Sequence, residues 1–108
     1  MSGARLRPEI AGLLDVENPV AEDDVVVNDA ALAPGYGQIN DAVREAVRLC
    51  ASREGLLLDP VYTGKTMATL IAMLREGAFD ATDHVLFVHT GGLPAIFAYP
   101  EMLDAAAA

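Results

Sequence analysis

The sequence Asp-Pro-Val-Tyr-Thr-Gly-Lys occupies residues 59–65, and a related sequence, His-Thr-Gly-Gly, occupies residues 89–92. Each follows a short apolar run, at residues 56–58 and 85–88, and each precedes a stretch that is typical of a helix. In open α/β sheets, ligands bind in the crevice outside the carboxyl ends of the strands. The two stretches therefore predict two strand-to-helix turns that share one pocket.

Helices and strands alternate outward from these turns. Helices are predicted where apolar residues recur at helical spacing, at residues 5–14, 38–54, 63–76 and from about residue 93. Strands are predicted where short apolar runs occur, at residues 25–27, 56–58 and 85–88. Such alternation favours parallel strands joined by right-handed crossovers. We therefore expect an α/β fold, with three layers around a parallel sheet.

The helix limits have their own signals in the sequence. Asn40 or Gln38 can cap the start of the second predicted helix, because short polar side chains accept hydrogen bonds from free amides there. Gly55 and Gly77 stand where a left-handed residue commonly ends a helix. The face shared by Met67, Leu70, Ile71 and Leu74 predicts burial of one side of the third helix.

Composition excludes several classes of function. The chain has 108 residues, enough for one small domain, and its net charge of −9 argues against nucleic-acid binding. No apolar run approaches the length of a membrane span, and no signal peptide is recognised at the N-terminus. The lone Cys50 cannot form an internal disulfide, and no metal-ligand spacing is present. We expect a soluble, cytoplasmic protein.

Local motifs leave alternatives open. A phosphate-binding loop is excluded, since that pattern needs a glycine at position 59, where the chain has Asp59. Lys65 could meet an anion at a helix start or be solvated. Residues 35–37 and 90–92 suit either close approach to a ligand or simple tight turns. His89 is more typical of a hydrogen-bonded structural residue than of a catalytic acid or base.

Several of these motifs occur together in one order and spacing. They are Gly-Tyr-Gly at 35–37, Arg-Leu-Cys-Ala at 48–51, Glu-Gly at 54–55, residues 59–65 and His-Thr-Gly-Gly-Leu-Pro-Ala at 89–95. Together they resemble the C-terminal part of the D-cysteine desulfhydrase and 1-aminocyclopropane-1-carboxylate deaminase family. These are pyridoxal 5'-phosphate (PLP) enzymes of the tryptophan-synthase-β type. The resemblance covers about residues 25–99 and implies a partial PLP-binding domain.

The resemblance implies roles for particular residues. Tyr36 and Tyr62 match two active-site tyrosines that face the substrate. Thr90 matches the residue whose hydroxyl approaches the pyridine nitrogen, and Gly91 and Gly92 match the turn beside the ring.

The residues that differ between the branches of the family are also informative. The deaminase branch has Glu and Leu where this chain has Thr63 and Thr90, and both differences favour the desulfhydrase branch. We expect Thr63, like Thr90, to belong to the cofactor-binding residues.

For full-length relatives the resemblance implies a homodimer that acts on a small amino acid. The implied reaction is α,β-elimination, in which D-cysteine yields pyruvate, ammonia and sulfide. L-Cysteate sulfo-lyase and aminocyclopropane-carboxylate deaminase are alternatives within the family. A non-catalytic small α/β binding module is the alternative outside it.

The resemblance also predicts how the chain is organised. Residues 1–108 would be the C-terminal portion of the large PLP domain, with 1–24 peripheral, 25–99 family-like and 100–108 a tail. The Schiff-base lysine lies in the N-terminal part of these enzymes and is not matched by Lys65. We therefore expect the isolated chain to be inactive and its PLP binding to be doubtful.

Overall fold

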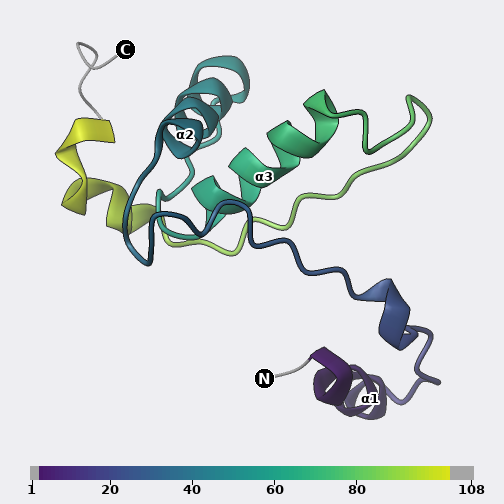
Figure 1. Cartoon of the computed structure of the whole chain (residues 1–108). Coiled ribbons are helices and arrows are strands. Elements are labelled where there is room, and N and C mark those ends of the chain that lie inside the picture. Colours follow the sequence, from purple (N-terminus) through teal and green to yellow (C-terminus); the bar gives the residue numbers. More distant parts are fainter. Residues whose placement is uncertain (1–2, 103–108) are drawn as a thin grey trace.

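The computed structural model describes residues 3–102 and is helical. Its elements, in order, are α1 (Gly3–Leu13), η1 (Glu22–Asp24), α2 (Asp41–Glu54), α3 (Thr63–Arg75), η2 (Leu93–Ala98) and η3 (Pro100–Met102), where η denotes a 3-10 helix. In Figure 1, α2 and α3 lie side by side with η2 and η3 at one end, whereas α1 stands apart on an extended segment.

The second helix begins and ends as its sequence predicts. The Asn40 side chain accepts a hydrogen bond from the backbone amide of Val43 at 2.9 Å, which sets the start of α2 at Asp41 instead of residue 38. Gly55 follows the helix with φ of 63°, a left-handed conformation that suits glycine. The buried stripe of α2 consists of Val43, Ala46, Val47 and Cys50.

The third helix approaches the second through its first turn. A Cβ atom at Gly64 would lie 2.6 Å from the carbonyl oxygen of Asp59 and 3.0 Å from Cγ2 of Val47, so only glycine fits. Thr63, Gly64, Lys65 and Ala68 are the buried residues of α3. The predicted apolar face is therefore only partly covered, and Leu74 at its far end is 52% exposed.

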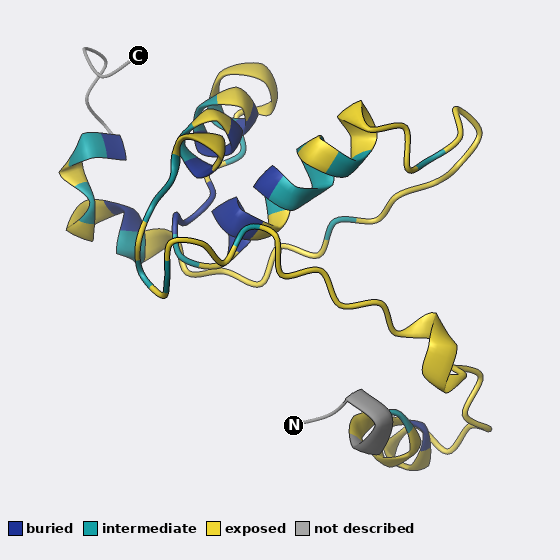
Figure 2. Ribbon diagram, in the orientation of Figure 1, coloured by how far each residue is buried: buried dark blue, intermediate teal, exposed yellow. Residues whose placement is uncertain are grey.

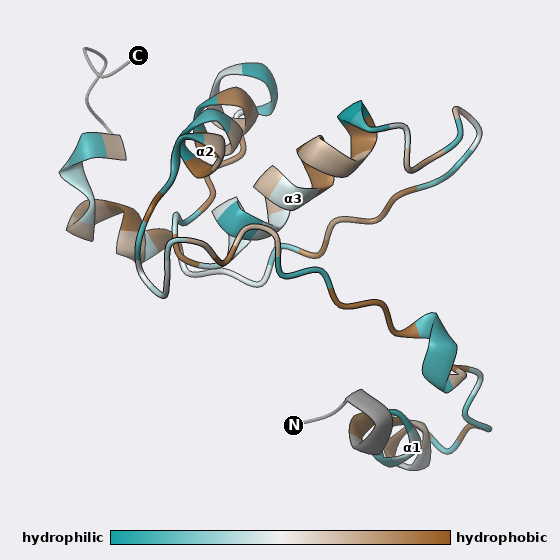
Figure 3. Cartoon of the chain, in the orientation of Figure 1, coloured by the Kyte–Doolittle hydropathy of each residue, from teal (hydrophilic) through white to brown (hydrophobic). Residues whose placement is uncertain are grey.

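The predicted parallel sheet is wrong for the part of the chain that the structure describes, because no strand is present between residues 3 and 102. Strands are stable when their backbone groups pair with a neighbour, and the runs at 25–27, 56–58 and 85–88 do not pair with one another. Val27 and Leu86 are 84% and 86% exposed. Figures 2 and 3 show that residues 25–27 are both apolar and exposed.

Two further predictions concern a membrane span and the C-terminal tail. Within residues 3–102, no helix is long and apolar enough to cross a membrane. The predicted tail begins with η3, whose Met102 is buried against the core, while residues 103–108 lie outside the described range.

Candidate functional site

The turn at residues 59–63 is folded around the buried carboxylate of Asp59. One carboxylate oxygen accepts hydrogen bonds from the amides of Val61 and Tyr62, at 2.9 and 2.7 Å. The other accepts from the amide and the hydroxyl of Thr63, at 2.9 and 2.6 Å. A carboxylate that accepts from free amides in this position stabilises the start of a helix, here α3.

The same hydrogen bonds determine the protonation of Asp59. Burial of the carboxyl group raises its pKa, but the hydrogen bonds from the Thr63 hydroxyl and from the three backbone amides together outweigh this effect. The pKa of Asp59 therefore lies below its ordinary value, and the group is a carboxylate at neutral pH.

The second predicted turn lies against the first. Nδ1 of His89 accepts a hydrogen bond from the amide of Gly91 at 3.0 Å, so Nε2 carries the proton that is donated to the carbonyl of Leu57 at 2.9 Å. Gly92 lies beside the Asp59 side chain, because a Cβ atom there would be 3.1 Å from Cγ. The predicted juxtaposition of the two turns is thus observed, and His89 has the structural role that its position favours.

A third segment, residues 33–37, carries Tyr36 and is joined by hydrogen bonds to α3 and to Tyr99, which follows η2. Side chains from three places in the chain donate hydrogen bonds to its alternate carbonyls: Asn40 to Ala33 (3.0 Å), Lys65 to Gly35 (2.8 Å) and Tyr99 to Gly37 (2.8 Å). The segment is therefore held on both sides of Tyr36, which itself remains 81% exposed.

The two predicted catalytic tyrosines meet at this place. The hydroxyl oxygens of Tyr36 and Tyr62 are 2.6 Å apart, and the rings meet edge to face with centroids 6.1 Å apart. The hydrogen bond with Tyr36, followed by the charge of the Tyr36 phenolate, raises the pKa of Tyr62. Both rings are exposed, so the pair presents two hydroxyls to solvent and can hold or pass a proton between them.

The predicted cofactor-binding residues occupy different surroundings. Thr63 is buried and its hydroxyl is bonded to Asp59, whereas Thr90 is exposed and its hydroxyl has no partner within residues 3–102. Gly91 and Gly92 have φ of 97° and 86°, which lets the turn adopt a left-handed path. Their contacts with a cofactor stay predictions.

Sequence reasoning missed two supporting residues. Asp59 stands four positions before Thr63, where its carboxylate can cap the start of α3. In the sequence alone, the same residue is equally typical of the polar end of a strand. Lys65 is the only lysine in the sequence. The alternative that it is solvated is wrong, since it is 6% exposed and donates to Gly35. No sequence signal distinguishes this lysine from a solvated one.

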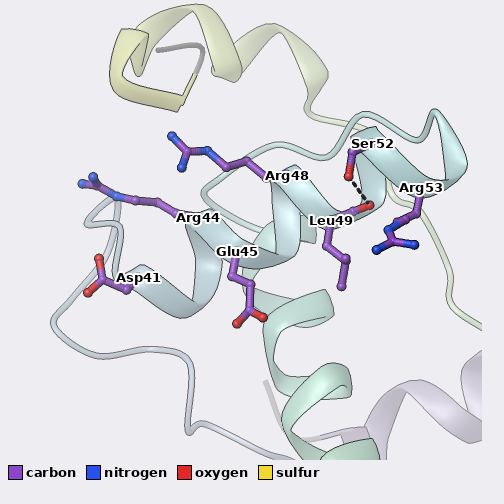
Figure 4. Close-up of a pocket in the computed structure, with 7 residues that line it drawn as sticks. All are labelled: Asp41, Arg44, Glu45, Arg48, Leu49, Ser52 and Arg53. Atoms are coloured by element: carbon purple, nitrogen blue, oxygen red, sulfur yellow. Dashed lines mark hydrogen bonds between the residues drawn. The ribbon is translucent and has the colours of Figure 1, made fainter. Parts of the chain in front are cut away.

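The outer face of α2 carries a separate hollow of about 490 Å³, shown in Figure 4. Its lining residues are Asp41, Arg44, Glu45, Arg48, Leu49, Ser52 and Arg53. Glu45 at this face forms an exposed ion pair with Arg75 of α3. None of the predicted site residues lines the hollow, and no group of side chains suited to a metal ion occurs in the described part of the chain.

Comparison with known proteins shows that the chain is homologous to a segment of curated enzymes. A 1-aminocyclopropane-1-carboxylate deaminase of Burkholderia vietnamiensis is 45% identical over 98 residues, which are 91% of this chain and 29% of the relative. A D-cysteine desulfhydrase of Salmonella newport is 52% identical over 94 residues, or 87% of this chain and 28% of the relative. No protein-family model matches.

These relatives confirm the predicted resemblance to the D-cysteine desulfhydrase and 1-aminocyclopropane-1-carboxylate deaminase family. The chain spans less than a third of the length of the curated relatives that it matches.

Proposed function

We propose that this chain forms one wall of the active site of a PLP-dependent, D-cysteine desulfhydrase-like lyase. The observation that carries the proposal is the exposed Tyr36–Tyr62 hydroxyl pair beside the two turns. Identity to the desulfhydrase, at 52%, exceeds identity to the deaminase, at 45%. The threonines at positions 63 and 90 support the same branch.

The described residues fit part of a PLP site. PLP, when bound, acts as an electron sink at the substrate carbon next to the amino group. The exposed hydroxyl of Thr90, which has no partner within residues 3–102, suits a hydrogen bond to a ring nitrogen. Nothing lies within 4 Å of the Cβ position of Gly91, which leaves room for a flat ring there. Thr63 would act differently, since its hydroxyl fixes Asp59 and so the position of Tyr62.

In the complete enzyme the proposed reaction converts D-cysteine and water into pyruvate, ammonia and hydrogen sulfide. The hydroxyl pair would exchange a proton with the substrate, because each tyrosine can donate or accept at its oxygen. We further propose that this chain alone is inactive. Its only lysine, Lys65, is buried and hydrogen-bonded to the carbonyl of Gly35. The sequence has no other amine side chain to which PLP could be attached covalently.

A chimera tests the proposed function directly. This chain would replace the 94 matching residues of the Salmonella D-cysteine desulfhydrase. Ammonia would be measured with D-cysteine, L-cysteate and aminocyclopropane-carboxylate as substrates, and sulfide would also be measured with D-cysteine. We expect the chimera to release sulfide from D-cysteine, and the matched Tyr62→Phe chimera to lose at least about tenfold in rate. Preference for aminocyclopropane-carboxylate would assign the chain to the deaminase branch instead.

A binding module without catalysis is the competing function, and the burial of the only lysine favours it for the chain alone. A chimera that folds and shows PLP absorbance but releases neither sulfide nor ammonia would support this alternative. It would also contradict the proposed lyase function.

A further inference from the structure

Lys65 occupies a position that is unfavourable for a lysine. It lies in the first turn of α3, where the helix dipole is positive, and only 6% of its surface is exposed. Burial of an ammonium group costs free energy unless it is hydrogen-bonded. Within residues 3–102, the hydrogen bond that offsets this cost runs from Nζ to the carbonyl of Gly35 at 2.8 Å.

That contact joins the two segments that carry the tyrosines of the site. Gly35 precedes Tyr36, and Lys65 follows Tyr62 by less than one helical turn. The lysine therefore ties the segment that carries one hydroxyl to the helix start that carries the other. The backbone of Tyr62 is already fixed by Asp59. Asn40 and Tyr99 hold the two ends of the segment, and the lysine is the contact that links its middle, next to Tyr36, to the start of α3.

We propose that Lys65 is a positioning residue that brings the hydroxyl of Tyr36 to that of Tyr62 by holding the Gly35 carbonyl. The role in catalysis rests on the proposed lyase function. The geometric role belongs to this chain alone and is measurable without PLP or substrate.

The test uses Lys65→Met in the full chain, because methionine retains most of the apolar stem and removes the donor. The matched control is Arg75→Met, which removes a cation from the exposed end of the same helix. The first readout, at neutral pH, is the nuclear Overhauser effect between the Tyr36 and Tyr62 rings. We expect it to be lost in Lys65→Met and retained in Arg75→Met.

The second readout is the ionisation of Tyr62, followed by NMR of a labelled phenol carbon. Because the hydrogen bond with Tyr36 raises the pKa of Tyr62, both Lys65→Met and Tyr36→Phe should lower that pKa. The double variant should shift it no further than Tyr36→Phe alone, since the lysine acts through Tyr36. If Lys65→Met instead loosened the fold in general, the double variant would shift the pKa of Tyr62 further than Tyr36→Phe alone does.

An unchanged ring contact and an unchanged Tyr62 ionisation in a helical Lys65→Met variant would overturn the proposal. If that variant does not fold, the unmodified chain decides, because a bonded lysine must show a nuclear Overhauser effect between its ε-protons and the α-protons of Gly35. Absence of that signal also overturns the proposal. An inactive chimera with both signals intact rejects the lyase function alone.

Discussion

Gly92 lies directly against the carboxyl group of Asp59: a Cβ atom at position 92 would be 3.1 Å from both Cγ and Oδ1. The contact joins two turns that are far apart in sequence. Since the carboxylate of Asp59 also holds the amide of Tyr62, the second turn is placed relative to the tyrosine pair.

Alanine substitution at the two glycines of this turn tests the contact. Gly91 and Gly92 both have positive φ, so each alanine should cost roughly 1 kcal/mol in backbone strain. Only the alanine at 92 would also press on Asp59, and we expect a further loss of about 1 kcal/mol in the free energy of unfolding. Urea denaturation followed by circular dichroism measures the difference, and equal losses would show that the turns are not in contact.

Gly64→Ala tests the close approach of α3 to α2. The added Cβ would lie 2.6 Å from a backbone oxygen, which cannot move as a side-chain end can, so we expect a loss of about 2 kcal/mol in stability. Gly12→Ala in α1 is the control, because nothing lies within 4 Å of its Cβ position. That variant should leave the denaturation midpoint of the α2–α3 unit unchanged. A neutral Gly64→Ala variant would contradict the observed packing.

Asp59→Asn tests the buried carboxylate through its pH dependence. The folded-state pKa of Asp59 is lowered, so the folded state binds this proton less readily than the unfolded state does. The carboxylate therefore adds stability above the ordinary pKa of aspartate, near 3.9, and this contribution disappears as the pH falls through the lower folded-state value.

We expect Asp59→Asn to cost about 1–2 kcal/mol at neutral pH, with a smaller difference from the parent chain near pH 3. Unfolding in urea at both pH values measures this. Asp80→Asn, a change at another aspartate whose carboxylate accepts no hydrogen bond in the described structure, is the control for general charge effects. A difference between parent and Asp59→Asn that grows on acidification would contradict the assignment.

Cys50 reports on the core between α2 and α3. Burial, followed by the charge of Glu54, raises the pKa of its thiol, so little reactive thiolate is present near neutral pH. We expect a disulfide reagent to react with the native chain at least about tenfold more slowly than with the urea-unfolded chain. Equal rates in the two states would show that the core around Cys50 is open.

The helices of this protein are predictable from its sequence because their signals are local. Asn40 and Gly55 bound α2 through contacts with their immediate neighbours, and the stripe ending at Cys50 is buried as its spacing predicts. The sheet could not be judged in the same way. An apolar run such as residues 85–88 favours a strand only where a neighbouring strand pairs with it. The rest of the fold decides whether that neighbour is present.

The residues of the candidate site also differ in whether the sequence predicts them. The resemblance identifies Tyr36 and Tyr62, and the structure brings them together. The contacts of Asp59 and Lys65 could not be predicted from the sequence. The contacts of Asp59 depend on how the turn after it folds, and that of Lys65 depends on where the distant carbonyl of Gly35 lies. A residue type alone does not reveal which carbonyl it will meet.

The apolar run at residues 85–88, exposed except for the half-buried Phe87, also affects the behaviour of the chain in solution. Unpaired backbone beside apolar side chains is a template for edge-to-edge association between copies. The net charge of −9 opposes this association through mutual repulsion. Because salt screens that repulsion, the chain should self-associate more strongly as ionic strength rises, and light scattering across a salt series would follow the change.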